Sequence, residues 1–290
     1  MRIARSGSPR PGRRTPGNAE SGASRAAGPA HSGKVILKLE DVSKSFGSVV
    51  ALDGVSFEVF ENEKVALVGD NGAGKSTLIK IISGNFPPDR GTICLDGKKV
   101  SFRSPVDARR AGIETVYQDL SVCNNLDSIS NLFIGRELTR SLLGLQVLRG
   151  RQMEETTNAV LRKVGISMPS SRDRMEYLSG GQRQAVALGR FVAWGKRLVL
   201  LDEPTAALGV RETRQVLTLI EATARERTSI LLISHNLLQV FEVVDRIVVL
   251  RHGKVVGVRE KKKTTPDEIV GMITGAIFIK ARGRKEDPGT

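Results

Sequence analysis

Short apolar runs alternate with amphipathic stretches from residue 35 onward, and this alternation predicts strands and helices in turn. Apolar runs, several of them rich in β-branched residues, predict strands at 35–39, 55–59, 64–68, 92–95, 113–117, 197–201, 229–233, 246–250 and 255–258. Helical spacing predicts helices at 76–82, 127–134, 151–164, 181–194 and 211–227, with another that begins at Ser104-Pro105. We therefore expect an α/β fold, with a mainly parallel sheet covered on both faces and an antiparallel entry sheet at the start.

The middle of the chain has a different pattern. Residues 119–178 contain polar helical stretches and no convincing strand. This predicts a helical subdomain at about 119–190, inserted within one larger domain at 34–276. No internal repeat is apparent, so we expect one nucleotide site in the chain.

The two ends differ in composition from the part between them. Residues 1–33 are rich in Gly, Ser, Pro, Ala and Arg and contain almost no bulky apolar side chain, which predicts a disordered basic leader. An organellar transit peptide shares this Arg-rich, acid-poor composition, and a start assigned upstream of the real one is a further alternative. Residues 277–290 are expected to form a flexible basic tail.

The positive charge lies mainly in the flanks. The net charge is +14, of which residues 1–33 contribute +5, residues 259–263 contribute +3 and residues 280–287 contribute +2. This distribution argues against a basic groove built into the fold, so no specific nucleic acid is expected as a partner. Cys94 and Cys123 have neither metal-ligand nor CxxC spacing. No apolar run of membrane-spanning length occurs, so any membrane role would require a partner.

A complete phosphate-loop pattern follows the strand at 64–68 and precedes the helix at 76–82. It matches G-x-x-x-x-G-K-[ST] and reads Gly69-Asp70-Asn71-Gly72-Ala73-Gly74-Lys75-Ser76-Thr77. In this strand-turn-helix context, backbone N–H groups and the positive end of the helix dipole can hold an oligophosphate. Lys75 can then reach the β- and γ-phosphates, and Ser76 can bind Mg²⁺.

Two adjacent carboxylates follow the apolar strand at 197–201. A cation explains why two acids would stand at the end of a buried strand, so Asp202 is expected near Mg²⁺, directly or through a water ligand. Glu203 would then orient and deprotonate the water that attacks the γ-phosphate. On its own, this pair also fits a solvated acidic strand end.

A second glycine-rich segment stands just before the helix at 181–194. It reads Leu178-Ser179-Gly180-Gly181-Gln182, and two glycines at a helix start can expose N–H groups to an anion. In isolation, Ser179 also fits an ordinary N-cap. With this segment, residues 35–275 resemble the ATP-binding cassette (ABC) family, whose signature reads LSGGQ between the phosphate loop and the acidic strand.

The resemblance implies roles for further residues. ATP would lie between the phosphate loop of one subunit and Ser179, Gly180, Gly181 and Gln182 of another, so a homodimer is expected. Gln118 would approach Mg²⁺ and the attacking water, and His235 would hydrogen-bond the γ-phosphate and hold Glu203. Phe46 would stack on adenine, although it fits a core aromatic equally well. Mg²⁺ would then be held by Ser76, Gln118 and Asp202, and catalysis would involve Glu203, His235, Gln118 and Lys75.

Further segments are similar to the monosaccharide-importer branch of the ABC family, including 69–72, 104–108 and 203–210. The family commonly has Ser-Ala-Leu-Asp where this chain has Ala206-Ala207-Leu208-Gly209, so the carboxylate across the dimer is missing. The resemblance implies an ATPase on the cytoplasmic face of the membrane that works with a permease and, indirectly, a solute-binding protein. Another solute, or a soluble ABC-type ATPase, is the alternative.

Overall fold

The computed structural model describes residues 33–117, 122–165, 170–195, 197–206, 208–224 and 228–277. Its centre is a six-stranded sheet in the order β12-β11-β3-β10-β9-β6. The five strands from β11 to β6 are parallel, and β12 pairs with β11 in the antiparallel direction. The bounds are β3 Lys64–Val68, β6 Ile113–Val116, β9 Leu198–Asp202, β10 Ser229–Ile233, β11 Arg246–Arg251 and β12 Lys254–Glu260.

Both faces of the central sheet are covered, because alternate residues of each buried strand point to opposite sides. Ala66 and Val68 of β3 join a core built with α5, α6, α7 and α8. Val65 and Leu67 join a second core built with α1, α2 and the antiparallel sheet. The helices are α1 Lys75–Ile82, α2 Pro105–Arg110, α5 Gly180–Trp194, α6 Val210–Ala224, α7 Leu237–Val243 and α8 Pro266–Thr274.

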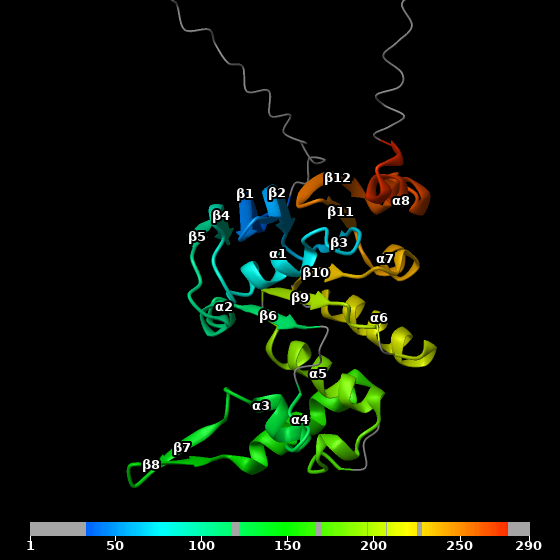
Figure 1. The fold of residues 1–290 in the computed structure, drawn as a ribbon. Helices are drawn as coiled ribbons and strands as arrows, with labels where there is room; N and C mark the ends of the chain where they lie inside the picture. The colour runs from blue at the N-terminus through cyan, green and yellow to red at the C-terminus, as the bar shows by residue number, and fades with distance from the viewer. Residues whose placement is uncertain are drawn as a thin grey trace, which may run out of the picture.

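The antiparallel sheet has the order β2-β1-β4-β5 (Figure 1). Its strands are β1 Val35–Phe46, β2 Val49–Phe60, β4 Arg90–Leu95 and β5 Lys98–Val100. Strands β1 and β2 are longer than the sequence pattern predicts. Register shifts along the pair let the two strands stay hydrogen-bonded beyond their buried segments. The long β1-β2 hairpin thereby brings the backbone oxygen of Ala51 next to Gly74 of the glycine-rich loop.

The helical subdomain lies at one end of the molecule, below the central sheet in Figure 1. It contains α3 Ser128–Phe133, α4 Gly150–Val164, the 3-10 turn Met175–Tyr177 and part of α5. Buried side chains of α3, α4 and α5 pack together, among them Phe133, Val160 and Phe191. A second 3-10 turn, Lys261–Lys263, precedes α8.

The expectation that residues 119–178 contain no strand is wrong. A two-stranded hairpin, β7 Thr139–Leu142 and β8 Leu145–Leu148, projects from the helical subdomain (Figure 1). A turn at Leu143-Gly144, where Leu143 has φ 49° and Gly144 has φ 82°, closes it. The run Leu142–Leu148 is short and mostly apolar, so its pattern alone does not separate a strand from a helix turn.

The predicted α/β architecture is confirmed. The order and type of the predicted strands agree with the structure, with ends that differ by a few residues for most elements. The helix predicted at Ser104-Pro105 is α2, whose first turn is capped by Ser104 Oγ accepting from Asp107 N–H at 3.3 Å. The predicted leader, apart from Gly33, and the tail beyond Ile277 lie outside the described residues.

Candidate nucleotide site

Three parallel strands end at one edge of the central sheet, and each leads into residues of the candidate site. The glycine-rich loop follows β3, Asp202 ends β9 and Glu203 follows it, and His235 stands two residues after β10. The register places Ile233 opposite both Leu67 and Asp202, so these three strand ends are level. In open parallel sheets, ligands bind outside the carboxyl ends of the strands. The sheet therefore gathers residues separated by more than a hundred positions in the sequence.

The glycine-rich loop has two positions where only glycine fits. Gly74 has φ 103°, and a Cβ there would lie 2.5 Å from the backbone oxygen of Ala51 in β2. A Cβ on Gly69 would lie 2.2 Å from the backbone oxygen of Leu250 in β11. The loop is thus held between two strands, and α1 begins at its end with N–H groups that no side chain caps.

Lys75 reaches back across this loop. Its Nζ donates to the backbone oxygen of Gly69 at 2.8 Å and to that of Asp70 at 2.9 Å. Burial lowers the pKa of the Lys75 ammonium, and the nearby carboxylates of Glu203, Asp202 and Asp70 act in the opposite direction. The loop lysine and the strand-end acids therefore share one electrostatic site.

Asp202 and Glu203 occupy different environments although they are adjacent. Asp202 is buried, and its burial and the neighbouring Glu203 raise the pKa of its carboxyl group, while Lys75 and Lys80 oppose that shift. Glu203 has φ 51°, a left-handed backbone conformation that is uncommon for a residue with a side chain. Its N–H donates to the backbone oxygen of Ile233 at 3.0 Å, which holds the turn in place.

Glu203 and His235 are in direct contact. Nδ1 of His235 lies 2.8 Å from Oε2 of Glu203, and the histidine side chain is 71% exposed while that of the glutamate is 11% exposed. A second bond joins the segments that carry them, because Thr205 Oγ1 donates to Gln239 Oε1 at 2.6 Å. Thr205 and Gln239 carry no sequence signal that points to this role.

The LSGGQ segment lies in a different part of the molecule from the glycine-rich loop. Ser179 caps α5 in a reciprocal capping box: Ser179 Oγ accepts from Gln182 N–H at 3.2 Å, and Gln182 Oε1 accepts from Ser179 N–H at 2.9 Å. A Cβ on Gly181 would lie 3.3 Å from Cγ of Glu212 in α6. The ordinary N-cap interpretation of Ser179 is thus correct, and it leaves the anion-binding role at this helix start as a proposal.

The remaining predicted residues have separate positions. Phe46 is 49% exposed and packs edge to face on Phe86, with ring centroids 5.4 Å apart. Lys44 Nζ lies 5.7 Å from the Phe46 ring centroid. Phe46 is therefore not a core aromatic, and its ring is accessible to a ligand. Gln118 lies outside the described residues.

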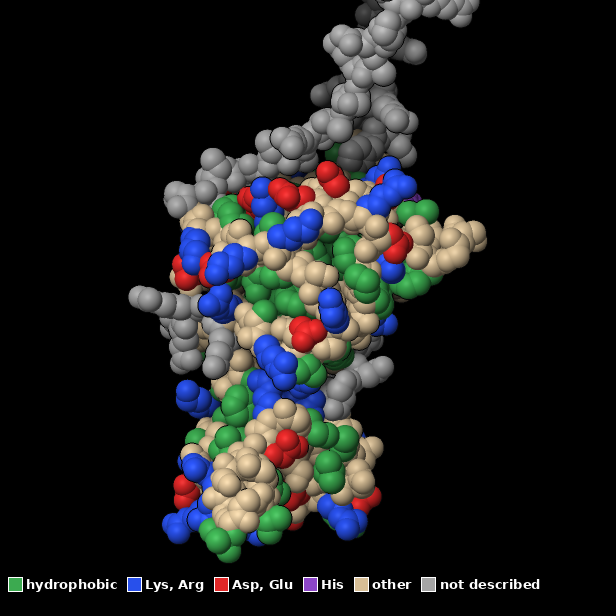
Figure 2. Space-filling view, turned by 90° about the vertical axis from the view of Figure 1, so that its left-hand side faces the viewer, with side chains coloured by type: hydrophobic (Ala, Val, Ile, Leu, Met, Phe, Trp, Pro, Cys, Tyr) green, Lys and Arg blue, Asp and Glu red, His purple; other side chains and the backbone are tan. Residues whose placement is uncertain are grey.

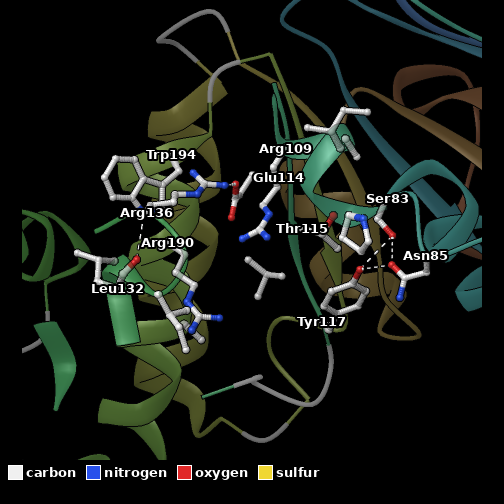
Figure 3. Close-up of a pocket in the computed structure, with 16 residues that line it drawn as sticks. Ser83, Asn85, Arg109, Glu114, Thr115, Tyr117, Leu132, Arg136, Arg190 and Trp194 are labelled. Atoms are coloured by element: carbon white, nitrogen blue, oxygen red, sulfur yellow. Dashed lines mark hydrogen bonds and ion pairs between the residues drawn. The ribbon is translucent and has the colours of Figure 1, made fainter. Parts of the chain in front are cut away.

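A groove of about 270 Å³ runs between the central sheet and the helical subdomain. Arg109 of α2, Glu114 of β6, Arg136 after α3 and Arg190 of α5 line it, and Figure 3 shows Arg109 and Arg136 reaching toward Glu114. Arg136 Nη2 pairs with Glu114 Oε2. These residues come from four separate elements, so sequence reasoning missed their combination.

Tyr117 closes one end of this groove, directly before Gln118. Its hydroxyl lies 3.0 Å from Ser83 Oγ and 2.8 Å from Asn85 Oδ1, both just after α1 (Figure 3). The end of the glycine-loop helix is thereby linked to the end of β6. The sequence shows only an aromatic residue at a strand end.

The residues at this edge of the sheet fit Mg²⁺ and a nucleoside triphosphate. Asp202 provides a carboxylate and Ser76 a hydroxyl, which are the oxygen donors that Mg²⁺ prefers. The pKa of the Asp202 carboxyl group is shifted by burial and by neighbouring charges, and no hydrogen bond to it occurs among the described residues. A cation at that position would also relieve the repulsion between Asp202 and Glu203. Among the residues that the structure describes, no cluster of three or more His, Cys, Asp or Glu side chains is suited to a metal.

A parallel sheet with a glycine loop, a loop lysine and two acids at its carboxyl edge defines a P-loop nucleotide-binding protein. The chain belongs to the ABC transporter family, whose model matches residues 52–206. It is 48% identical over 239 residues to the xylose/arabinose import ATP-binding protein of Sulfolobus acidocaldarius, covering 82% of this chain and 94% of that relative. It is 45% identical over 245 residues to the fructose import ATP-binding protein of Rhizobium meliloti, covering 83% and 94%.

Solved structures show the same fold. An ATP-binding cassette dimer bound to ADP and phosphate in a post-hydrolysis state superposes with a TM-score of 0.69 at 23% identity, over 79% of this chain and 100% of that one. An ATP-binding cassette in the ADP conformation superposes with a TM-score of 0.67 at 24% identity, over 85% and 97%. The predicted resemblance to the ABC family and its monosaccharide-importer branch is confirmed.

Proposed function

We propose that this chain is the ATP-hydrolysing subunit of an importer for a monosaccharide or a related polyol. The observation that best supports ATP hydrolysis is the contact between Glu203 Oε2 and His235 Nδ1, at the sheet edge that also holds Lys75. The substrate class is supported by similarity to proteins named for xylose/arabinose and fructose import, over most of both chains. Another solute, or an ATPase without a transport role, remains the alternative that the experiment below tests.

The loop and its lysine bind and orient the triphosphate. Backbone N–H groups of residues 69–77 face the phosphates, and Lys75 exchanges its bonds to the backbone oxygens of Gly69 and Asp70 for bonds to phosphate oxygens. Mg²⁺, held by Ser76, Gln118 and Asp202, would neutralise phosphate charge when bound. Phe46 presents an accessible ring on which adenine stacks.

Glu203 acts as the general base for the attacking water. Its left-handed backbone directs the side chain back to His235, and one carboxylate oxygen is held by that histidine. Because Nδ1 donates to Glu203, His235 Nε2 can donate to the γ-phosphate only when the ring is doubly protonated. The histidine therefore holds the base in position, and its Nε2 is the ring nitrogen that faces the γ-phosphate.

The active unit is a homodimer with ATP between the two subunits. The start of α5 lies away from the glycine-rich loop of the same chain and carries Ser179, Gly180, Gly181 and Gln182. These residues therefore complete the nucleotide site of a second copy. The helix dipole and the free glycine N–H groups favour the γ-phosphate there. Gly209 leaves no carboxylate at the position where the family commonly has one, so coupling between the two sites uses other contacts.

The groove that Tyr117 closes at one end receives a cytoplasmic segment of the permease. Its lining combines the guanidinium groups of Arg109, Arg136 and Arg190 with the apolar surface of Leu132 and Trp194. This mixture suits a short amphipathic segment that carries a carboxylate. None of the helices in the described part of the chain has the length and apolarity needed to cross a bilayer. The subunit is placed on the cytoplasmic face of the membrane by this contact, and a separate solute-binding protein delivers the cargo.

The test is solute uptake by cells that carry Lys75→Ala, with Lys99→Ala on the exposed strand β5 as the matched control. Uptake of labelled pentoses, hexoses and polyols should be lost in Lys75→Ala cells and retained in the control. Loss of amino-acid uptake with normal sugar uptake would replace the substrate class. Unchanged uptake of every solute, with ATPase activity lost, would assign a role outside transport.

A further inference from the structure

The β7-β8 hairpin presents an apolar face that the rest of the described chain leaves uncovered. The register pairs Arg140 with Val147 and Leu142 with Leu145, so these four side chains share one face. Leu143 in the turn is 97% exposed and Leu145 is 71% exposed. An isolated two-stranded hairpin is marginally stable in water, and exposed contiguous apolar surface indicates a binding partner.

Basic side chains flank the strands of this hairpin. Of the four arginines in residues 136–151, Arg136 pairs with Glu114 and Arg151 pairs with Glu155, while Arg140 and Arg149 lie on the hairpin itself. Arg140 of β7 and Arg149, directly after β8, are exposed, and Arg149 N–H donates to the backbone oxygen of Leu138 at 2.8 Å, which closes the base of the hairpin. The one acidic side chain in this range, Glu137, accepts from Gly135 N–H at 2.9 Å. An apolar end flanked by arginines is complementary to an anionic lipid surface.

The shape of the hairpin favours lipid over a protein partner. The tip is convex and carries hydrocarbon side chains without a side-chain hydrogen-bonding group at Leu142, Leu143, Gly144 and Leu145. A protein partner would need a pocket that matches this tip, whereas the interfacial layer of a bilayer accepts any apolar group of sufficient size. Figure 2 views the side to which the hairpin points, where Lys or Arg side chains appear at the lower end and at the waist above it.

We propose that the β7-β8 hairpin inserts its leucine tip into the headgroup layer of an anionic membrane, with Arg140 and Arg149 contacting lipid phosphates. This contact requires neither ATP nor a permease, so it does not rest on the proposed function. It provides a membrane contact through the helical subdomain. A single short tip gives weak, reversible binding, in keeping with the marginal binding of one inserted apolar group.

The first experiment places a fluorescent reporter at the tip of the full chain. Trp194 is the one native tryptophan, so Leu143→Trp adds a single reporter, with the wild-type chain as blank. Leu238→Trp is the matched control, because Leu238 is 78% exposed on α7. Vesicles of phosphatidylcholine with phosphatidylglycerol should shift Leu143→Trp emission to the blue, and lipids brominated in their acyl chains should quench it. Neither change is expected for Leu238→Trp.

The second experiment measures the apolar contribution separately from charge. Co-sedimentation with the same vesicles at about 1 M salt, where the Debye length is about 3 Å, suppresses attraction by the basic flanks. Combined substitution of Leu142, Leu143 and Leu145 by Ser should lower partitioning at least about tenfold, while Leu238→Ser leaves it unchanged. Equal melting temperatures of these variants show that the fold is retained.

An unchanged Leu143→Trp spectrum in anionic vesicles would overturn the proposal, even if the chain sediments with them through its flanks. If Leu143→Ser also reduces solute uptake in that case, the hairpin is assigned to a protein contact. ATPase activity of the purified variants is a separate readout, so failure of the lipid contact and failure of the proposed function are distinguishable.

Discussion

Thr205 Oγ1 donates a 2.6 Å hydrogen bond to Gln239 Oε1, and this contact joins the segment after Glu203 to the helix after His235. Gln184 of α5 reaches the same segment, with Nε2 donating to the backbone oxygen of Pro204 at 2.6 Å. The segment that carries Glu203, the helix after His235 and the helix that begins at Ser179 are thereby connected. We infer that this contact positions Glu203 and does not itself take part in the chemistry.

Thr205→Val tests that positioning role. Loss of one partly buried neutral hydrogen bond should lower kcat about three- to tenfold while KM for ATP changes little. Thr218→Val on α6 is the matched control, because Thr218 is exposed and bonds only locally to Arg214. Steady-state ATPase kinetics decide the outcome, and an equal fall for both variants would indicate a general loss of stability.

Glu203→Gln should bind ATP but hydrolyse it at least about a hundredfold more slowly, since general-base catalysis contributes up to about 10⁴-fold. His235→Ala should also lower turnover, because Glu203 loses the bond to His235 Nδ1. Glu242→Gln, an exposed carboxylate on α7, is the control and should retain activity. Single-turnover kinetics with nucleotide-binding measurements separate binding from chemistry. Near wild-type turnover of Glu203→Gln would exclude the general-base role.

ATP should convert Glu203→Gln from monomer to dimer, because each chain holds the loop and the LSGGQ segment in separate places. Adding Ser179→Arg should abolish dimerisation while leaving nucleotide binding to the monomer intact, since the arginine occupies the helix start that faces the partner. Ser101→Arg, at an exposed site before α2, is the control. Sedimentation velocity reads the mass directly. Dimers that persist with Ser179→Arg would place the interface elsewhere.

The buried pair between Glu63 and Arg246 should dominate the electrostatic contribution to stability. Arg246 donates from Nε to Glu63 Oε1 at 2.6 Å and from Nη2 to Oε2 at 2.8 Å, and both side chains are buried. Glu63→Leu leaves the guanidinium buried without its carboxylate and should cost about 3–5 kcal/mol in free energy of unfolding. Asp53→Asn, which removes the exposed partner of Lys254, should cost under about 1 kcal/mol. Urea unfolding compares them, and similar small losses would contradict this assignment.

Glu114 should make the protein less stable as pH rises. Burial raises the pKa of its carboxyl group, and this outweighs the opposing effect of Arg136. The native state then holds the proton more tightly than the unfolded state, so unfolding free energy falls as pH rises from the ordinary glutamate pKa of about 4.3 through the higher native value. Glu114→Gln removes this dependence. Its melting temperature relative to wild type should therefore rise between acidic and neutral pH.

The stability of Glu114→Gln also tests whether burial or the attraction to Arg136 has the larger effect on Glu114. If Glu114→Gln becomes less stable than wild type at neutral pH, the attraction to Arg136 outweighs the cost of burial. Glu221→Gln, which removes an exposed carboxylate on α6, is the control. Differential scanning calorimetry over the pH range gives both curves under identical conditions.

The sequence by itself determined the architecture and located the glycine-rich loop and the acidic residues at the strand end. Strand and helix periodicity, together with the spacing of Gly69 to Thr77 and of Asp202 and Glu203, depends on local backbone geometry, which neighbouring residues specify. The resemblance to the ABC family, which the LSGGQ segment carries, added His235 to the expected site. The roles assigned to these side chains in binding and catalysis remain predictions, as do those of Gln118 and Ser179.

Only the tertiary structure decided which distant residues meet. The groove combines Arg109, Glu114, Arg136 and Arg190 from four elements, and the Thr205–Gln239 bond depends on the alignment of β9 with β10. The β7-β8 hairpin also needed the structure, because a short apolar run without a covering face has no periodicity that separates strand from helix. Long-range register places these side chains, and no local pattern encodes it.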